Sequence, residues 1–212
     1  MVTEEEIIGC VPIYDKFGKR AKEIFLKNAY KKTFQKGSRL PLEYGGALIF
    51  VKKGNAYVFS VGENGEEIFI YRLQKENCTR IKEGLEYEFT MATELIVLDG
   101  AFLSVFISSS PSVENFLLKE EIKLQDNILN QLNMIMFGSI DARLSSFLLS
   151  VMQKNHGHAL SLTHETIAKF IGSSREVITR KLKEYSDEGI IEKSRGKIIV
   201  KQKDALKKKC KI

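Results

Sequence analysis

The sequence predicts an α+β protein in three parts: an N-terminal antiparallel β-roll of the cupin or jelly-roll type, one long helix, and a small C-terminal helical domain that ends in two strands. Three features of the 212 residues predict it. Short β-branched and aromatic runs alternate with glycines between residues 33 and 107, residues 112–137 contain neither Gly nor Pro, and helix-capping signals follow residue 160. We therefore expect domains at residues 1–110, 111–137 and 138–212.

The β-roll is predicted from four strand-like runs, Ala47–Val51, Ala56–Val61, Glu67–Leu73 and Leu95–Leu98. The dipeptide Asn64-Gly65 lies between two of these runs and suits a type I′ hairpin turn, because both residues tolerate positive φ angles. Gly54 marks another turn. Apolar residues in the preceding segment 14–30 indicate one or two short helices that lead into the roll.

The long helix is expected to begin at Pro111 and to continue for about 26 residues, ending at Phe137 before Gly138. Alternating spacings of four and three residues mark a heptad seam on it: Leu118, Ile122, Gln125, Leu129, Leu132 and Met136. A second apolar stripe, with Leu124 and Ile128, runs beside the seam. We expect one stripe to pack on the roll and the seam to pack on a second copy of the chain, which predicts a homodimer. The alternative is that one subunit covers both stripes.

The C-terminal segment predicts a winged helix-turn-helix. Thr163 can cap a short helix with an apolar face, and Gly172 permits a tight turn after it. Ser173-Ser-Arg-Glu176 has the form of a capping box for a second helix, which extends to about Ser186. Two short strands around Gly196 then form the wing.

Positive charge is concentrated in the last quarter of the chain. Residues 157–212 contain 14 of the 33 Lys and Arg residues but only 7 of the 27 Asp and Glu residues, whereas residues 1–156 are nearly balanced with 19 and 20. A concentrated basic region favours a nucleic-acid partner, although a basic face is sometimes only solvated.

The second helix of this domain carries side chains suited to reading DNA. Arginine offers two parallel donors to guanine O6 and N7, and a carboxylate accepts from cytosine N4, so we assign base reading to Arg175, Glu176 and Arg180. Glu176 has a competing role as a helix cap. Contacts to DNA phosphates are assigned to Ser174, Thr179, Lys183, Arg195 and Lys197. Two copies of this domain in a dimer predict a near-palindromic site on double-stranded DNA.

The run from Leu162 to Val200, together with the long helix and the roll, resembles the Crp/Fnr family of bacterial transcription regulators. The segment Gly172-Ser-Ser-Arg-Glu-Val-Ile-Thr-Arg180 carries the resemblance most specifically. The resemblance implies a sensor domain of the cyclic-nucleotide-binding type, a dimerisation helix and a DNA-binding winged helix, with RNA polymerase as a further partner. It also places Arg175, Glu176 and Arg180 at the family's base-reading positions. Lys181 departs from the family pattern, which has an apolar residue there, and predicts either looser helix packing or an added phosphate contact.

The cofactors of that family are not expected here. Members that bind cyclic nucleotides carry a Gly-Glu pair followed by Arg-Ser or Arg-Thr, but the stretch Lys75–Phe89 has Arg80 as its one arginine and several carboxylates that would repel a cyclic phosphate. Only Cys10 lies near the N-terminus, which is too few cysteines for an iron–sulfur cluster, and the roll has no histidine for haem or a metal ion. We therefore expect no cofactor and no metal.

Two hypotheses remain for the signal to which the predicted sensor domain responds. A small apolar or mixed ligand is the first, bound in the roll by Phe50, Phe59, Tyr71, Arg80 and Phe89; the alternative is that these aromatic residues are plain core. The second is oxidation of Cys78, whose thiol pKa would be lowered by Arg80 and Lys82 if the residue lies in a loop; the alternative is an inert thiol. A contrasting function is a ligand-independent architectural DNA-binding dimer, in which the roll is only a scaffold.

Other classes of function are disfavoured. The sequence shows no Ser/His/Asp set, no paired carboxylates and no phosphate-binding glycine loop, so we do not expect an enzyme. The longest apolar run near the middle, Ala47–Val51, is far shorter than the roughly 20 residues of a membrane span. The acidic N-terminus is unlike a secretory signal. We expect a cytoplasmic protein without a membrane partner.

Overall fold

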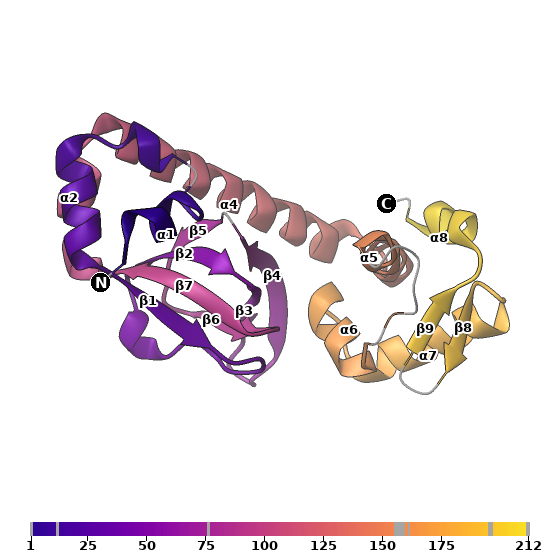
Figure 1. Cartoon of the computed structure of the whole chain (residues 1–212). Helices are drawn as coiled ribbons and strands as arrows, with labels where there is room; N and C mark the ends of the chain where they lie inside the picture. The colour runs from indigo at the N-terminus through magenta and orange to yellow at the C-terminus, as the bar shows by residue number, and fades with distance from the viewer. Residues whose placement is uncertain are drawn as a thin grey trace. The chain divides into compact units, whose positions relative to one another are not determined.

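The computed structural model describes residues 2–11, 13–75, 77–154, 160, 162–194 and 197–210 (Figure 1). The chain forms two compact units, Met1–Val61 with Ile70–Ile128 and Gly62–Phe69 with Leu129–Ile212. The boundary between them falls inside one continuous helix, α4 (Pro111–Phe137), which therefore contributes residues to both units.

The first unit begins with three short helical segments, α1 (Glu4–Ile8), η1 (Tyr14–Lys16) and α2 (Lys19–Asn28). The last two confirm the short helices predicted between residues 14 and 30. A further short segment, η2 (Leu42–Tyr44), precedes the second strand. Two antiparallel sheets follow, with strand orders β1-β7-β2-β5 and β4-β3-β6. Their strands are β1 (Ala29–Phe34), β2 (Leu48–Lys53), β3 (Asn55–Val61), β4 (Glu67–Gln74), β5 (Cys78–Arg80), β6 (Leu85–Phe89) and β7 (Thr93–Leu98).

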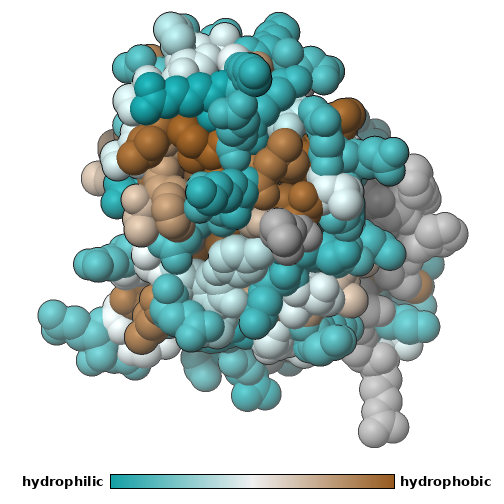
Figure 2. All heavy atoms as spheres, turned by 60° about the vertical axis from the view of Figure 1, so that its left-hand side comes forward, coloured by the Kyte–Doolittle hydropathy of each residue, from teal (hydrophilic) through white to brown (hydrophobic). Residues whose placement is uncertain are grey.

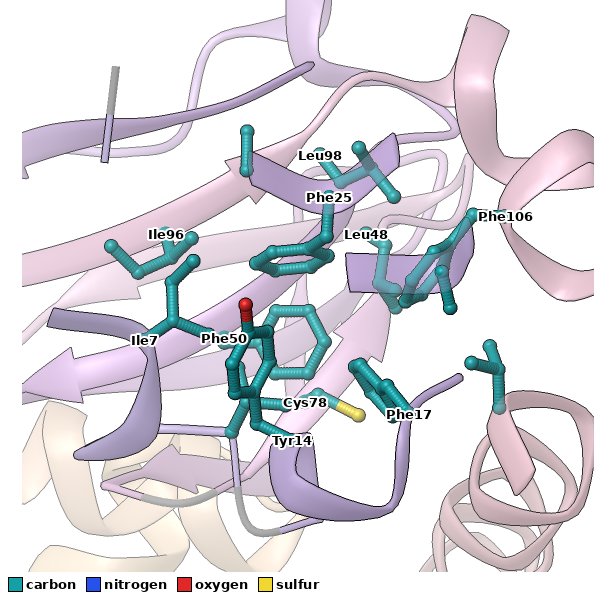
Figure 3. Close-up of a cluster of buried hydrophobic side chains, with 14 of the residues drawn as sticks. Ile7, Tyr14, Phe17, Phe25, Leu48, Phe50, Cys78, Ile96, Leu98 and Phe106 are labelled. Atoms are coloured by element: carbon teal, nitrogen blue, oxygen red, sulfur yellow. The ribbon is translucent and has the colours of Figure 1, made fainter. Parts of the chain in front are cut away.

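Strand β2 is buried on both faces of its sheet, which explains its continuous apolar run. Leu48 and Phe50 belong to a cluster with the N-terminal helices, whereas Ile49 and Val51 belong to a second cluster between the two sheets. In Figure 3 the ring of Phe50 lies beneath that of Phe25, and their centroids are 5.4 Å apart in an edge-on arrangement. The roll is therefore a packed core and not an open barrel.

The structure corrects two sequence predictions in this unit. The strand-like pattern does not continue to residue 107, because Gly100–Ser108 forms helix α3, whose N-cap Asp99 accepts a hydrogen bond from the amide of Ala101 at 2.8 Å. The turn at Asn64-Gly65 is not a two-residue type I′ turn. The amide of Gly62 donates to the carbonyl of Glu66 at 2.8 Å, so residues 63–65 form a longer loop, with Gly65 at φ +77°.

Helix α4 confirms the predicted long helix and separates its two apolar stripes. Leu124 is buried between the sheets, and Ile128 packs against the same cluster. The heptad seam remains exposed, with 57% of Leu118 and Leu129 and 70% of Met136 accessible to solvent. The alternative that one subunit covers both stripes is therefore wrong for this chain.

The second unit contains the C-terminal helices and a two-stranded wing. Its elements are α5 (Ile140–Lys154), α6 (His164–Ile171), α7 (Arg175–Asp187), β8 (Ile191–Ser194), β9 (Lys197–Val200) and α8 (Lys203–Lys209). They enclose a core to which α5 contributes Leu144 and Leu148, and α7 contributes Ile178, Leu182 and Tyr185. The turn predicted at Gly172 is confirmed, and the two short strands predicted within residues 190–200 are confirmed as β8 and β9, whereas Gly196 lies outside the described residues.

Surface hydropathy is mixed. On the face drawn in Figure 2, apolar side chains reach the surface in patches framed by hydrophilic ones. Among the described residues, no single helix has the length and hydropathy of a membrane span, and α3 with α4 satisfies that criterion only as a pair bent by 120°.

Candidate nucleic-acid interface

Helices α6 and α7 are held at their ends by specific hydrogen bonds. The Thr163 hydroxyl accepts from the amide of Thr166 at 3.0 Å, as predicted for the N-cap of α6. Gly172 ends that helix in the left-handed region at φ +63°. The guanidinium of Arg143 donates to the carbonyls of Ile171 and Gly172 at 2.7 and 2.8 Å, so α5 fixes the turn between the two helices.

The cap of α7 differs from the prediction by one residue. Ser174, not Ser173, is the N-cap, and its hydroxyl accepts from the amide of Val177 at 3.3 Å. The capping box predicted at Ser173–Glu176 is therefore wrong, since valine occupies the third position of the helix. Glu176 still lies in the first turn, where hydrogen bonds from its own amide and from the Ser174 hydroxyl lower its carboxyl pKa. Glu176 is accordingly an anionic acceptor at this end of α7.

Helix α7 exposes the residues predicted to read bases. Its buried face consists of Ile178, Leu182 and Tyr185. Glu176 and Arg180 are exposed on the opposite side, and Arg175 is exposed in the first turn. Lys183 is exposed one turn further along. These positions follow the helical period, which is why the sequence could identify the exposed face.

The remaining predicted phosphate contacts have different surroundings. Lys197 is exposed at the start of β9, whereas Arg195 lies outside the described residues. The hydroxyl of Thr179 donates to the carbonyl of Arg175 and lies 2.8 Å from Nδ1 of His164. Thr179 therefore joins α7 to the start of α6, and a contact with phosphate would have to compete with these two partners.

Sequence reasoning missed two residues beside the wing. His164 and Lys193 line a groove of about 390 Å³ together with Thr163, Ser194 and Lys197. Burial and the nearby charges of Lys193 and Arg175 lower the pKa of His164, which keeps its ring neutral at pH 7. The alternation Glu192-Lys193-Ser194 in a short exposed strand was the available signal for Lys193.

Ion pairing divides the basic residues of this domain into two groups. Lys181 pairs with Asp141 at 3.1 Å and Glu184 at 2.8 Å. Its ammonium therefore ties α7 to α5, so neither looser packing nor a free phosphate contact describes it. Among the described residues of α7 and the wing strands, by contrast, a second group has no carboxylate partner: Arg175, Arg180, Lys183, Lys193 and Lys197. This unneutralised group gives α7 and the wing a positive surface.

The residues predicted to bind an effector inside the roll do not share one cavity. Phe50 packs among the N-terminal helices, whereas Tyr71 and Phe89 lie between the sheets. Phe59 is also buried. Of the five, Arg80 is the one that lines the cavity of about 700 Å³ beside strand β5. The roll interior is thus filled by its own side chains, and the set Phe50, Phe59, Tyr71, Arg80 and Phe89 is not a single binding site.

The redox hypothesis for Cys78 is also not supported. The residue lies in strand β5 and not in a loop, and it is only 6% exposed. Figure 3 shows its sulfur directed toward Phe17 in the apolar cluster. Burial raises the thiol pKa of Cys78, so the thiol is protonated and unreactive at neutral pH. Within the described residues, no group of three or more His, Cys, Asp or Glu side chains is arranged to hold a metal ion.

Comparison with known proteins agrees with this geometry. A family model described as a Crp-like helix-turn-helix domain matches residues 142–209. A putative Crp/Fnr-family transcriptional regulator from Eubacterium rectale is 26% identical, with a TM-score of 0.86 over 94% of this chain and 97% of that one. Comparison with curated protein sequences finds no match.

More distant structures share the fold. The c-di-GMP-responsive global regulator CLP of Xanthomonas campestris is 14% identical, with a TM-score of 0.74 over 85% of this chain and 97% of that one. A Crp/Fnr-family regulator from Thermus thermophilus is 18% identical, with a TM-score of 0.69 over 85% of this chain and 98% of that one. The fold and the exposed face of α7 thus define a DNA-binding protein with a winged helix-turn-helix. The chain carries a Crp-like helix-turn-helix domain and is similar over nearly its whole length to a regulator of the Crp/Fnr family, whose members are transcription factors and not enzymes.

Proposed function

We propose that the protein is a homodimer that binds a near-palindromic DNA site in the cytoplasm and regulates transcription in response to a small-molecule effector. The observation that carries the DNA-binding part is the unneutralised positive charge on α7 and the wing. Five cations there have no carboxylate partner among the described residues, while Lys181 on the same helix is fully paired. Charges left unpaired within a protein are free to neutralise phosphates.

Base reading is assigned to Arg175, Glu176 and Arg180, and phosphate binding to Ser174, Lys183 and Lys197. We add Lys193, because it lines the wing groove with Lys197. The arginines supply bidentate donors for guanine, and Glu176 supplies an acceptor for cytosine. The lysines hold the domain on the backbone without distinguishing sequences.

Dimerisation is assigned to the exposed seam of α4. Leu118, Leu129 and Met136 each expose more than half of their area, although they are apolar. Burying such a seam against its symmetry-related copy is a common way to satisfy a heptad pattern. The two α7 helices of the dimer would then contact successive major grooves about one helical turn of DNA apart. RNA polymerase is a further partner in this proposal, at a surface of the dimer bound to DNA.

The test is selection of bound DNA from a random pool by the purified protein, without added ligand. We expect a palindrome with half-sites about ten base pairs apart. A pool with no enriched motif and a steep salt dependence of binding would instead indicate a ligand-independent architectural dimer. Repeating the selection with a cell metabolite extract separates that outcome from an unmet requirement for an effector.

A further inference from the structure

A cavity of about 700 Å³ lies on the helical side of the four-stranded sheet. It is bounded by the Gly45–Gly46 turn, the strand β5, the helix α3 and the first half of α4. Its volume is within the range of roughly 300–1,000 Å³ that small-molecule sites occupy. This space is separate from the interior of the roll, which the cluster between the sheets fills.

One wall of the cavity is apolar and uncharged. Leu48, Leu103, Ile107 and Leu117 line it from the sheet and from both helices. The protonated thiol of Cys78 belongs to the same wall. Covering this wall with a hydrocarbon chain would remove apolar surface from water at roughly 25 cal/mol per Å².

The other wall carries charges, most of which are already paired. Lys82 lies 2.8 Å from Glu121, and Glu120 pairs with Lys123. Arg80 differs from them, because its exposed guanidinium has no hydrogen-bond or ion-pair partner among the described residues. A Cβ at Gly46 would lie 4.0 Å from Nη2 of Arg80, so the guanidinium reaches across the glycine turn at the edge of the cavity.

We propose that this cavity binds an amphipathic monocarboxylate. The carboxylate pairs with Arg80 in the bidentate geometry that a guanidinium offers, and the hydrocarbon part lies on the wall formed by Leu103, Ile107 and Leu117. Three carboxylates, Glu83, Glu120 and Glu121, also line the cavity against two cations, Arg80 and Lys82. Glu121 and Glu120 are paired with Lys82 and Lys123, so Arg80 remains to hold one negative charge, and the carboxylates around it would disfavour a phosphate dianion more strongly than a monocarboxylate.

The position of the cavity connects it to the proposed dimer seam. Leu117 and Glu121 line the cavity, and Leu118 and Ile122 follow them directly in α4 as exposed residues of the seam. A ligand that contacts one side of this helix would shift the equilibrium between packing states of the other side. This regulatory part rests on the proposed function, whereas binding in the cavity does not.

Isothermal titration calorimetry with the full-length protein tests the binding. We use octanoate as the probe, octanamide as its neutral counterpart and octyl phosphate as the dianion. Saturable one-to-one binding of octanoate, at least tenfold tighter than either analogue, supports the proposal. Absence of octanoate binding, or equal binding of octanamide, overturns it.

Variants locate the site. Arg80→Gln should weaken octanoate binding at least tenfold, while the matched control Arg20→Gln, an exposed arginine of α2 outside the cavity, should leave it unchanged. Leu117→Phe places a larger side chain in the apolar wall and makes the cavity smaller, so it should also weaken octanoate binding. Circular dichroism and melting temperature verify that each variant folds. Unchanged binding by both folded cavity variants would show that octanoate binds elsewhere and would overturn the assignment.

A DNA-binding measurement distinguishes failure of this inference from failure of the proposed function. Affinity for the selected operator is measured with and without saturating octanoate. A change that Arg80→Gln abolishes supports an effector role. Operator binding that is indifferent to bound octanoate overturns the effector role and leaves DNA recognition intact, whereas failure to bind any operator contradicts the proposed function itself.

Discussion

Arg180 and Lys197 are expected to contribute to DNA binding in different ways, although both are exposed cations. Arg180 lies on the exposed face of α7, and Lys197 lies at the start of β9 beside the wing groove. Arg180→Ala should cost about 1–3 kcal/mol on the preferred operator and relax the preference at one base pair. Lys197→Ala should weaken binding to all sequences alike. It should also reduce the slope of log affinity against log salt concentration by about one, because one phosphate contact is lost.

Fluorescence anisotropy with the operator and single-base variants, over a range of salt concentrations, measures both effects. If Arg180→Ala lowered the affinity for every variant equally, the base-reading assignment of Arg180 would be wrong. A specificity change in Lys197→Ala would likewise contradict its assignment to the phosphate backbone.

Gly172 is required by its backbone conformation. Its φ of +63° is the left-handed region, and a Cβ there would lie 3.3 Å from Cγ1 of Ile135 and 3.6 Å from Nη1 of Arg143. Gly172→Ala should therefore destabilise the protein by about 1–2 kcal/mol, the usual cost of this conformation for a residue with a Cβ. Urea unfolding measures the change.

The matched control for that experiment is Gly9→Ala. Gly9 also ends a helix, but it has φ −73°, and a Cβ would approach nothing closer than 4.0 Å. Its substitution should be nearly neutral. Equal stabilities of the two variants would contradict the strain argument at Gly172.

At the scale of elements, α4 makes the clearest prediction. Leu129→Glu places a charge in the exposed apolar seam and should convert a dimer to monomers, because an unpaired charge is costly to bury at an interface. Asn127→Glu is the control, since Asn127 is exposed on the side of the helix opposite the seam. Light scattering coupled to size-exclusion chromatography reports the mass of each variant. Retention of the dimer by Leu129→Glu would exclude the seam as the interface.

Elements with a strong period or clear caps could be predicted from sequence. Helix α4 and the pair α6 and α7 are of this kind, and their bounds agree with the prediction to within one residue. Strand β1 carries consecutive lysines, Lys31 and Lys32, and β5 has only three residues, so neither has an alternating apolar pattern. Helix α3 is apolar on most of its length, which makes it hard to distinguish from a buried strand.

The residues of the candidate site also divide into those that the sequence could predict and those that it could not. The reading face of α7 was predictable because a helix repeats its orientation every 3.6 residues. The cap at Ser174 and the Lys181 ion pair with Asp141 depend on a choice between adjacent residues and on a partner 40 positions away. The cavity at Arg80 depends on how α3 and α4 meet the sheet, and the local pattern around Arg80 contains no trace of it.

At the scale of the whole molecule, the free energy of unfolding should fall in acid as Glu6 becomes protonated. Its carboxylate lies 2.8 Å from Lys31 of β1 and 3.0 Å from Lys52 of β2, so it ties the N-terminal helix to two strands. Hydrogen bonds from these two lysines lower the pKa of Glu6 from 4.5 to about 2. Because the folded pKa is the lower one, the stabilisation is fully present above pH about 4.5 and disappears as the pH falls toward 2.

Glu6→Gln should therefore melt at a lower temperature than the wild type above pH 5, and the two melting temperatures should converge as the pH is lowered from 4.5 toward 2. Glu5→Gln is the control, because Glu5 is exposed and has no ion pair among the described residues. Its melting temperature should follow the wild type at every pH. A difference between Glu6→Gln and the wild type that stayed constant down to pH 3 would show that the contacts of Glu6 with Lys31 and Lys52 do not depend on its charge.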